Sequence, residues 1–232
     1  MGNPFNDYSE KWSGLLHFLI RYTTDMLKLY YSPGACSLAS HIALEEAKAP
    51  YTIQRVDLKN GEQRSPEYLK VNPKGRVPAL ATDRGILTES PVILGYIAQT
   101  FPEAKLAANE DSFAFGDMQA FNLFLTATVH IAFAHVFRPT RYGDGDATAV
   151  AMKAKASASL DESFAMIDKK MSDGRPYVHG DQYTVSDPYL LVFSRWLDRA
   201  DLGPVDKFER VAAHRKRIED RPAVKKVLAA EA

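Results

Sequence analysis

The stretch "YYSPGACSLASHIAL", residues 30–44, joins a strand-like run to a helix-like run and contains the only cysteine in the chain. The preceding run "LKLYY" is rich in strand formers, and the turn residues "SPG" at 32–34 end it. After the turn, the apolar residues of "CSLASHIALEEA" recur near helical spacing. The stretch therefore predicts a strand, a tight turn and a helix, with Cys36 at the start of that helix.

Cys36 is the first candidate for chemistry, because the start of a helix stabilises a thiolate. The first backbone N–H groups of a helix lack partners within it, and the helix dipole is positive at that end. We expect both effects to hold the pKa of the Cys36 thiol below the free value of roughly 8.5. The alternative is a buried, inert packing cysteine. The next residues are "SLA", so there is no Cys-x-x-Cys pair, and any disulfide needs an external thiol.

Composition and charge argue against several classes of protein. Of the 232 residues, 46% are hydrophobic and 25% are charged, as in an ordinary globular protein. Lys plus Arg and Asp plus Glu both number 29, so the net charge is zero and no nucleic-acid partner is indicated. A single cysteine fits a reducing compartment. The apolar run "LLHFLI" is far shorter than a membrane helix of about 20 residues. We expect a cytoplasmic protein with no membrane partner.

Turn signals divide the first part of the chain into β-α-β followed by β-β-α. Strands are expected at 27–31, 51–58, 76–82 and 86–89, and helices at 36–47, 66–70 and from residue 90 onward. After Pro102 the pattern is helical only, with long helices at 110–137 and 147–172. The predicted fold is α/β plus all-α, with an α/β domain at 26–104 and an all-helical domain at 110–232. Residues 1–25 are expected to be an extension outside the fold.

The segment "TVSDPYLLVFSRWL" carries the start signal of a further helix. Thr184 is followed three residues later by Asp187, ahead of an apolar run. This is the spacing of a capping box, in which the later side chain reaches back to the backbone N–H of the first residue. Two shorter helices are expected to follow.

Two short motifs in the first domain suit a peptide-like ligand. In "RVPAL", the Val77–Pro78 bond is a candidate cis peptide, and Val77 could offer its backbone N–H and C=O to an extended ligand. In "TESP", Ser90 is expected as helix N-cap with Pro91 as the first helical residue, which places a hydroxyl beside free N–H groups and suits a carboxylate. Glu89 could accept from an ammonium. The plainer alternatives are a trans edge-strand proline and an ordinary helix cap.

His130 is the main candidate in the helical part. On a helix, Asn122, Thr126 and His130 share one side of the apolar run "FNLFLTATVHIAFAHVF", which indicates either a side that lines a cleft or a satisfied interior histidine. His41 lies about 140° around the helix from Cys36, so a Cys-His pair there is not expected. No His, Cys or carboxylate spacing suggests a metal, and no glycine-rich loop suggests a nucleotide.

Together these motifs resemble the glutathione S-transferase family, and within it the bacterial, beta-class-like members. The residues that carry the resemblance are "YYSPGACSLASHIAL", "VNPKGRVPAL", "LTESP", "HIAFAHVFRP" and "TVSDPYL", and it extends from Met26 to Ala232. The resemblance implies a thioredoxin-like first domain that holds glutathione. It places Cys36 and His130 at the glutathione sulfur and assigns the other contacts to Lys59 (glycyl carboxylate), Val77 and cis Pro78 (cysteinyl backbone), and Glu89 and Ser90 (γ-glutamyl end).

The resemblance also implies an activity, which is conjugation of the glutathione thiolate to small hydrophobic electrophiles in detoxification. Glutathione is then the co-substrate, no metal is required, and the protein is a homodimer. The electrophile pocket would be walled by stretches such as "FNLFLTATVHIAF". Two departures from relatives concern this pocket: Ile131 stands where lysine is common, and Asn122 is one place out of register with an asparagine of relatives.

Two other functions stay open. One is glutathione-dependent thiol–disulfide exchange through Cys36, which predicts that Cys36→Ala abolishes disulfide reduction while conjugation survives at least partly. The other is a non-catalytic interaction protein on the same fold. Such a protein is expected to have lost Glu89–Ser90 or the Val-Pro step, and this chain has both.

Overall fold

The computed structural model describes residues 26–108, 111–200 and 202–232. The expected extension at 1–25 lies outside the described residues. The first half holds a four-stranded mixed sheet in the order β2-β1-β3-β4, in which β1 runs parallel to β2 and antiparallel to β3. The strands are β1 (Leu27–Tyr31), β2 (Tyr51–Arg55), β3 (Ala79–Thr82) and β4 (Gly85–Thr88).

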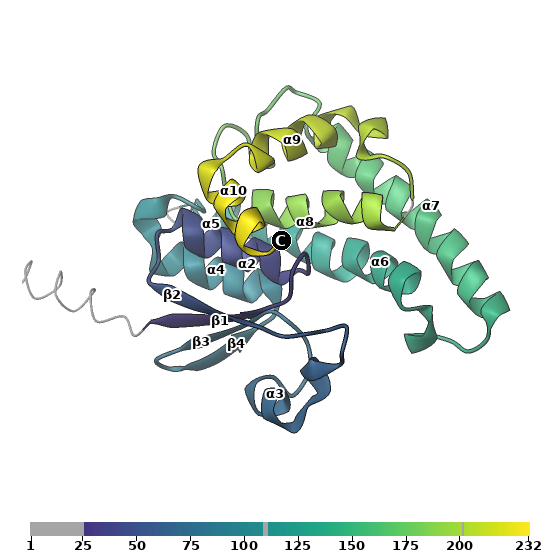
Figure 1. Cartoon of the computed structure of the whole chain (residues 1–232). Helices are drawn as coiled ribbons and strands as arrows, with labels where there is room; N and C mark the ends of the chain where they lie inside the picture. The colour runs from purple at the N-terminus through teal and green to yellow at the C-terminus, as the bar shows by residue number, and fades with distance from the viewer. Residues whose placement is uncertain (1–25, 109–110, 201) are drawn as a thin grey trace, which may run out of the picture.

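Helices α2 (Ser37–Glu46) and α4 (Ser90–Thr100) pack together on one face of the sheet, and α3 (Pro66–Val71) lies on the other side of it (Figure 1). Every residue of α2 from Ser37 to Leu44 is buried, because α2 lies between the sheet and helices of the second half. The short 3₁₀ turns η1 (Glu62–Arg64) and η2 (Pro102–Ala104) complete this half.

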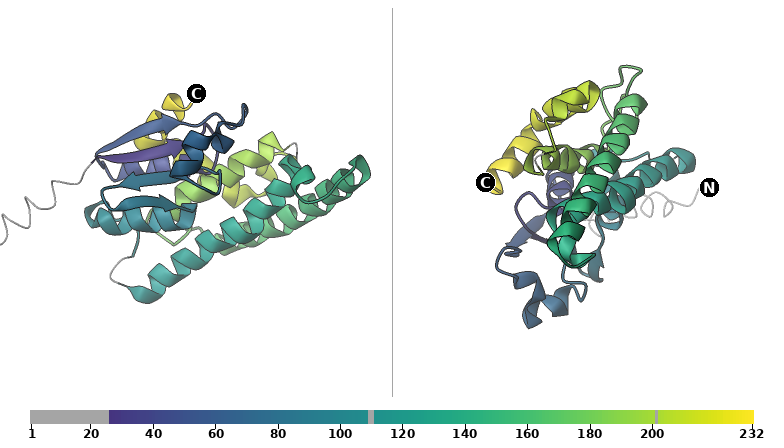
Figure 2. Two further views of the ribbon diagram at one scale, coloured as in Figure 1. Left: turned by 90° about the horizontal axis from the view of Figure 1, so that it is seen from below. Right: turned by 90° about the vertical axis from the view of Figure 1, so that its right-hand side faces the viewer.

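The second half is helical, as expected. A long run of α5 (Ser112–Phe124), the π-helical turn η3 (Leu125–Val129) and α6 (His130–Phe137) ends at the 3₁₀ turn η4 (Pro139–Arg141). It is followed by α7 (Asp146–Lys170), α8 (Ser186–Arg199), η5 (Val205–Lys207), α9 (Glu209–Glu219) and α10 (Pro222–Ala230). Helix α7 lies alongside α6 (Figure 2). The predicted fold class, a thioredoxin-like domain of a β-α-β unit and a β-β-α unit followed by an all-helical domain, is confirmed, with α3 between the two units. We propose the boundary between the domains in the connection from η2 to α5.

Helix α8 is the centre of the hydrophobic core. Leu190, Leu191, Phe193 and Leu197 on α8 are fully buried, and the helix packs against α2, α5 and α9. Phe193 stacks on Phe133 of α6, with ring centroids 6.2 Å apart. Since α8 contacts α2 of the first half and α5 and α9 of the second, its packing joins the two halves of the chain.

At α8 the predicted reach-back of Asp187 to Thr184 is present, although Val185 and not Thr184 occupies the cap position. The Asp187 carboxylate extends this contact into a buried polar centre. The Asp187 carboxylate accepts hydrogen bonds from the backbone N–H of Thr184 at 2.7 Å and of Val178 at 2.9 Å. It also lies 2.8 Å from Nε2 of His214 on α9, and both side chains are fully buried. One carboxylate therefore holds the start of α8, the preceding loop and α9.

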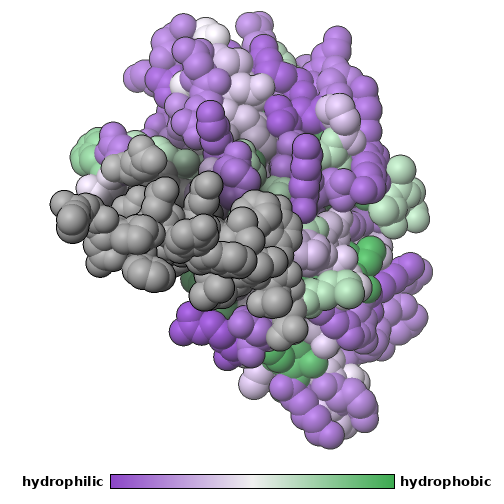
Figure 3. Space-filling model, turned by 90° about the vertical axis from the view of Figure 1, so that its left-hand side faces the viewer, coloured by the Kyte–Doolittle hydropathy of each residue, from purple (hydrophilic) through white to green (hydrophobic). Residues whose placement is uncertain are grey.

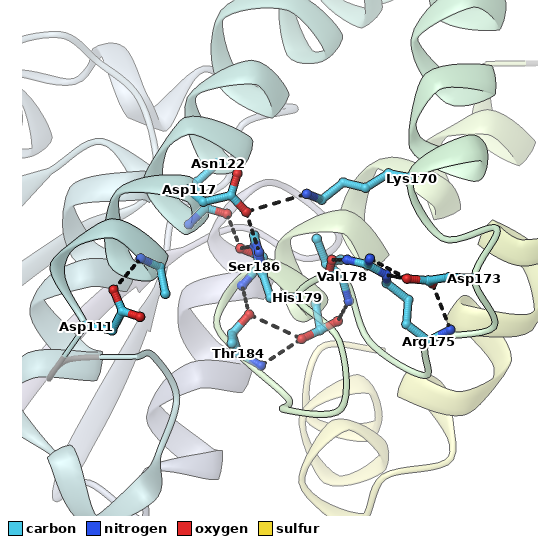
Figure 4. A network of polar contacts seen from close by, with 12 residues as sticks. Asp111, Asp117, Asn122, Lys170, Asp173, Arg175, Val178, His179, Thr184 and Ser186 are labelled. Atoms are coloured by element: carbon cyan, nitrogen blue, oxygen red, sulfur yellow. Dashed lines mark hydrogen bonds and ion pairs between the residues drawn. The ribbon is translucent and has the colours of Figure 1, made fainter.

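A second polar network lies beside it and connects α5 to α8 (Figure 4). Nδ1 of His179 is 3.2 Å from Asp117 and Nε2 is 3.1 Å from the Ser186 hydroxyl, which donates to Asn122 at 2.9 Å. The three side chains have the order of a hydrolase triad. Ser186 is fully buried and lines neither of the two cavities described below, so the network serves packing.

The helical stretch Ser112–Phe137 is, within the described ranges, the one long and apolar enough to cross a membrane by length and composition. In this structure one side of it packs against α4, α7 and α8, and 33% of its apolar window is buried. The face in Figure 3 is mostly hydrophilic outside the grey atoms, and hydrophobic residues form separate patches on it.

We predict that Asp187→Ala destabilises the fold strongly. It leaves two backbone donors and His214 without their buried partner, which costs about 3–5 kcal/mol in the free energy of unfolding. The matched control is Lys225→Ala, which breaks the exposed pair with Asp220 and should cost less than about 1 kcal/mol. Urea unfolding followed by circular dichroism measures both. Equal losses in the two variants would contradict the role assigned to Asp187.

Candidate functional site

Two adjoining cavities lie where the two halves of the chain meet. The larger has a volume of about 550 Å³ and is bounded by the turn at 32–36, the segment 55–63, and the ends of α6 and α8. The smaller, of about 100 Å³, extends toward the start of α4. The residues common to both linings are Cys36, Arg76, Val77, His130, Ala134 and Arg141.

The turn before Cys36 is held from several sides. The Ser37 hydroxyl accepts from the backbone N–H of Ser32 at 3.1 Å and donates to its carbonyl at 3.2 Å. The Gly34 carbonyl accepts from the indole N–H of Trp196 at 2.9 Å, and its N–H donates to the Glu231 carboxylate at 3.0 Å. Gly34 has a φ of 62°, a left-handed conformation that favours glycine. These contacts fix the place of Cys36 at the cavity wall.

Cys36 immediately precedes α2, as predicted, but its protonation differs from the expectation. Its side chain makes no cap hydrogen bond to the helix, and only 5% of the residue is exposed. Burial raises the pKa of the Cys36 thiol to about 12, with smaller opposing effects of its own backbone N–H and of Arg76. The prediction of a lowered pKa is wrong, because the cost of desolvating a thiolate outweighs the helix terminus. Cys36 is therefore a neutral thiol near pH 7.

His130 of α6 faces Cys36 across the cavity. The Cys36 sulfur is 3.6 Å from Nδ1 and 3.8 Å from Nε2 of the ring. The ring also packs edge-on against Trp196, with centroids 5.3 Å apart. Burial lowers the pKa of His130 to about 4, and the charges of Arg76 and Arg138 act in the same direction. The imidazole is neutral near pH 7 and can donate one hydrogen bond and accept another.

The predicted polar side of the long helix is only partly present. Thr126 and His130 line the smaller cavity, and the Thr126 hydroxyl is 2.7 Å from the hydroxyl of Tyr189. Asn122 is instead fully buried and accepts from Ser186. The π-helical turn η3 lies between Asn122 and His130 and changes the angular spacing from that of a regular helix. Of the two alternatives, the cleft-lining side therefore holds for Thr126 and His130 and not for Asn122.

The Val77–Pro78 peptide bond is cis, as predicted. Pro78 is buried and directly precedes β3, while Val77 lines both cavities. In the described part of the chain, the backbone N–H and C=O of Val77 have no hydrogen-bond partner. Both groups are available at the point where the cavities join.

At the start of α4 the structure corrects the predicted cap. Ser90 is the first residue of the helix and Pro91 the second, and Glu89 occupies the cap position with a φ of 73°. A positive φ is uncommon for a residue with a side chain, and such conformations cluster at functional sites. The Glu89 carboxylate accepts from the Lys74 ammonium at 2.6 Å. Ser90 is buried and lines the smaller cavity together with Tyr189.

Lys59 lies at the opposite end of the site. It is exposed and lines the larger cavity beside Arg55 and Gln63, whereas Glu89 and Ser90 line only the smaller cavity. The structure thus brings all the candidate residues to the walls of the two cavities. Their order along the site is Lys59, then Val77 with Cys36 and His130, then Pro78, Glu89 and Ser90.

Sequence reasoning missed several residues of the same walls. These are Trp196 and Tyr189 from α8 and the arginines Arg76, Arg138 and Arg141. Lys74, which donates to Glu89, lies outside both linings. The local signal for two arginines was the segment "FRPTRY" that ends the long helix. Trp196 and Tyr189 had no such signal, because they are part of an ordinary apolar helix pattern.

Comparisons with known proteins bear on the identity of this site. The family model of the glutathione S-transferase N-terminal domain matches residues 26–99, and that of the C-terminal domain matches residues 124–222. The glutathione S-transferase GstA of Escherichia coli O157:H7 is 34% identical over 207 residues, which cover 88% of this chain and 98% of GstA.

Solved structures of similar sequence share the fold. A glutathione transferase homologue from Sulfitobacter with bound glutathione has a TM-score of 0.82 at 34% identity, covering 88% of this chain and 98% of that one. A bacterial beta class glutathione S-transferase from Sphingomonas chungbukensis has a TM-score of 0.78 at 36% identity, with the same coverage. Because these matches include both halves and nearly the whole of each relative, the chain belongs to the glutathione S-transferase family.

Proposed function

We propose that this glutathione transferase joins the sulfur of glutathione to small hydrophobic electrophiles in the larger cavity. The observation that carries the proposal is the linear order of groups along the two cavities. A cationic end at Lys59, free backbone groups at Val77 and a helix start at Ser90 match the glycyl, cysteinyl and γ-glutamyl parts of glutathione in turn.

The γ-glutamyl end is assigned to the smaller cavity. Its carboxylate would accept from the Ser90 hydroxyl and from backbone N–H groups in the first turn of α4, where the helix dipole favours an anion. Its ammonium would be attracted to Glu89, which already shares its carboxylate with Lys74. Val77 would then pair with the cysteinyl backbone, and the glycyl carboxylate would reach Lys59.

This placement brings the glutathione sulfur to Cys36 and His130. The Cys36 thiol is protonated near pH 7, and the lowered pKa of His130 makes it a weak base, so we assign both as hydrogen-bond donors to the glutathione thiolate. In the reaction the sulfur forms a bond to the electrophilic carbon, the leaving group departs with its electron pair, and the thiol proton goes to solvent. Ala134, Phe137 and Trp196 supply an apolar wall for the electrophile.

The state of Cys36 favours conjugation over disulfide exchange. Exchange requires Cys36 to attack as a thiolate, and burial holds its pKa far above neutral. The interaction-protein alternative is weakened by the presence of both Glu89–Ser90 and the cis Val77–Pro78 bond. We propose a cytoplasmic role in detoxification, which the single cysteine and the apolar wall support.

We further propose that the protein is a homodimer. Exposed apolar side chains on neighbouring elements support a subunit interface: Ile86 on the edge strand β4, Val92 on α4, and Phe113 and Leu123 on α5. We predict that light scattering of the purified protein gives about twice the mass of the 25.9 kDa chain. A mass equal to one chain at micromolar concentration would contradict the dimer.

We predict that Ser90→Ala weakens glutathione binding by roughly ten- to a hundredfold, because one hydrogen bond to a carboxylate is lost. Calorimetric titration of the protein with reduced glutathione measures the dissociation constant and the stoichiometry, expected near one per chain. Ser157→Ala is the matched control, since Ser157 donates only to a backbone carbonyl within α7 and lines neither cavity. An unchanged affinity in Ser90→Ala, with the fold intact, would show that the carboxylate lies elsewhere.

For Cys36→Ala we expect conjugation to survive. Loss of one weak S–H donor should lower kcat/KM toward 1-chloro-2,4-dinitrobenzene by at most roughly tenfold. Reduction of 2-hydroxyethyl disulfide by glutathione should be slow in the wild type and little changed in the variant. A fast disulfide reduction that disappears in Cys36→Ala would instead establish exchange as the function.

A further inference from the structure

The larger cavity is strongly cationic although the chain as a whole carries no net charge. Among the described residues, its lining contains six cationic side chains, Arg55, Lys59, Arg76, Arg138, Arg141 and Arg199, and one carboxylate, Asp57. That carboxylate is turned to its own loop, where it accepts from the backbone N–H groups of Lys59 and Asn60. The excess of positive charge is therefore open to a ligand.

Glutathione accounts for only part of this charge under the proposed function. Its glycyl carboxylate needs the cations at one end of the cavity, Arg55 and Lys59. Its γ-glutamyl carboxylate is assigned to Ser90 in the other cavity. Arg199 is engaged in the fold, since it donates to the Gly34 carbonyl at 3.0 Å. Arg76 adjoins Val77 and so lies nearest the glutathione backbone. Arg138 and Arg141 are the two cations of the cavity to which no group of glutathione and no role in the fold is assigned.

Arg138 and Arg141 lie where the electrophile is expected. Both follow the end of α6, and Arg138 directly adjoins Phe137, which packs edge-on against Trp196 with ring centroids 5.6 Å apart. Within the described ranges, neither guanidinium forms an ion pair with a carboxylate. Burial lowers the pKa of Arg141, and the charges of Arg138 and Arg76 lower it further. The guanidinium groups thus repel one another at the rim of an apolar wall.

An anion between them would relieve this repulsion. A guanidinium binds a carboxylate through paired N–H···O hydrogen bonds, and these are stronger than bonds between neutral groups. We propose that the second substrate of this transferase carries a carboxylate on an aromatic or apolar body, with the carboxylate held by Arg138 and Arg141 and the body against Phe137 and Trp196. The inference rests on the proposed conjugation and specifies its substrate class.

A matched pair of electrophiles tests the proposal: 4-chloro-3,5-dinitrobenzoate and its methyl ester. In both, the glutathione sulfur bonds to the ring carbon at position 4, chloride leaves with the bonding electrons, and the thiol proton goes to solvent. Each kcat/KM is divided by the rate constant of the uncatalysed reaction with glutathione, which removes the difference in intrinsic reactivity. We expect the wild-type protein to favour the carboxylate over the ester by at least roughly tenfold.

Variants of Arg138 and Arg141 test whether these two residues cause the preference for the carboxylate over the ester. Arg138→Gln and Arg141→Gln should each lower the carboxylate-to-ester ratio by roughly ten- to a hundredfold, and Arg141→Lys should lower it less, because it keeps the charge and loses the paired geometry. Arg84→Gln is the control for a change of one charge. Arg84 lies in the β3–β4 turn, lines neither cavity, and should leave the ratio unchanged.

The possible results distinguish a failure of the proposed substrate class from a failure of the proposed conjugation. A protein that turns over the ester but shows no preference for the carboxylate contradicts the substrate class and leaves conjugation intact. Equal losses for both electrophiles in Arg138→Gln and Arg141→Gln also contradict it, since the arginines would then act on glutathione. No turnover of either electrophile by a folded protein that binds glutathione would overturn conjugation itself.

Discussion

The hydrogen bond from the Trp196 indole to the Gly34 carbonyl joins the two halves of the molecule at the point where chemistry is expected. The turn that carries Cys36 belongs to the first domain, and the helix that fixes the turn belongs to the second. The cavity exists because these two surfaces meet without filling the space between them. Its properties therefore depend on the docking of the domains as much as on either domain alone.

That docking also determines the electrostatics of the site. Helix α8 and His130 bury Cys36. The loss of solvation destabilises a Cys36 thiolate more than the N-terminus of α2 stabilises it, so the pKa of the thiol is raised. The same environment keeps His130 neutral. Cys36 and His130 can donate hydrogen bonds to the thiolate of a bound ligand, and the cationic cavity attracts anionic ligands. The same environment does not stabilise Cys36 itself as a thiolate nucleophile. The protonation states of Cys36 and His130 thus follow from packing. They favour conjugation over the disulfide exchange that the sequence left open.

The sequence was sufficient for most features with a local signal, although the cap of α4 is Glu89 and not the predicted Ser90. The turn before Cys36, the cis Val77–Pro78 bond, the Thr184–Asp187 hydrogen bond and the order of strands and helices each depend on a few adjacent residues, and the structure has them all. The pKa of Cys36 was predicted in the wrong direction because its burial comes from residues about 90 to 160 positions away, such as His130 and Trp196. The π-helical turn and the grouping of Arg76 with Arg138 and Arg141 likewise require the packed chain.

The contacts of Glu231 have a consequence for how this chain can be recombined with its relatives. One carboxylate oxygen accepts from the Gly34 N–H, and the other lies 2.8 Å from Nδ1 of the buried His41 on α2. Helix α10, just before Glu231, packs on α2 of the first domain (Figure 1). The first domain is thus completed by the last residues of the second. A chimaera that takes the sheet and α2 from this protein must also take α10 and Glu231, or its active-site turn will lack one of its supports.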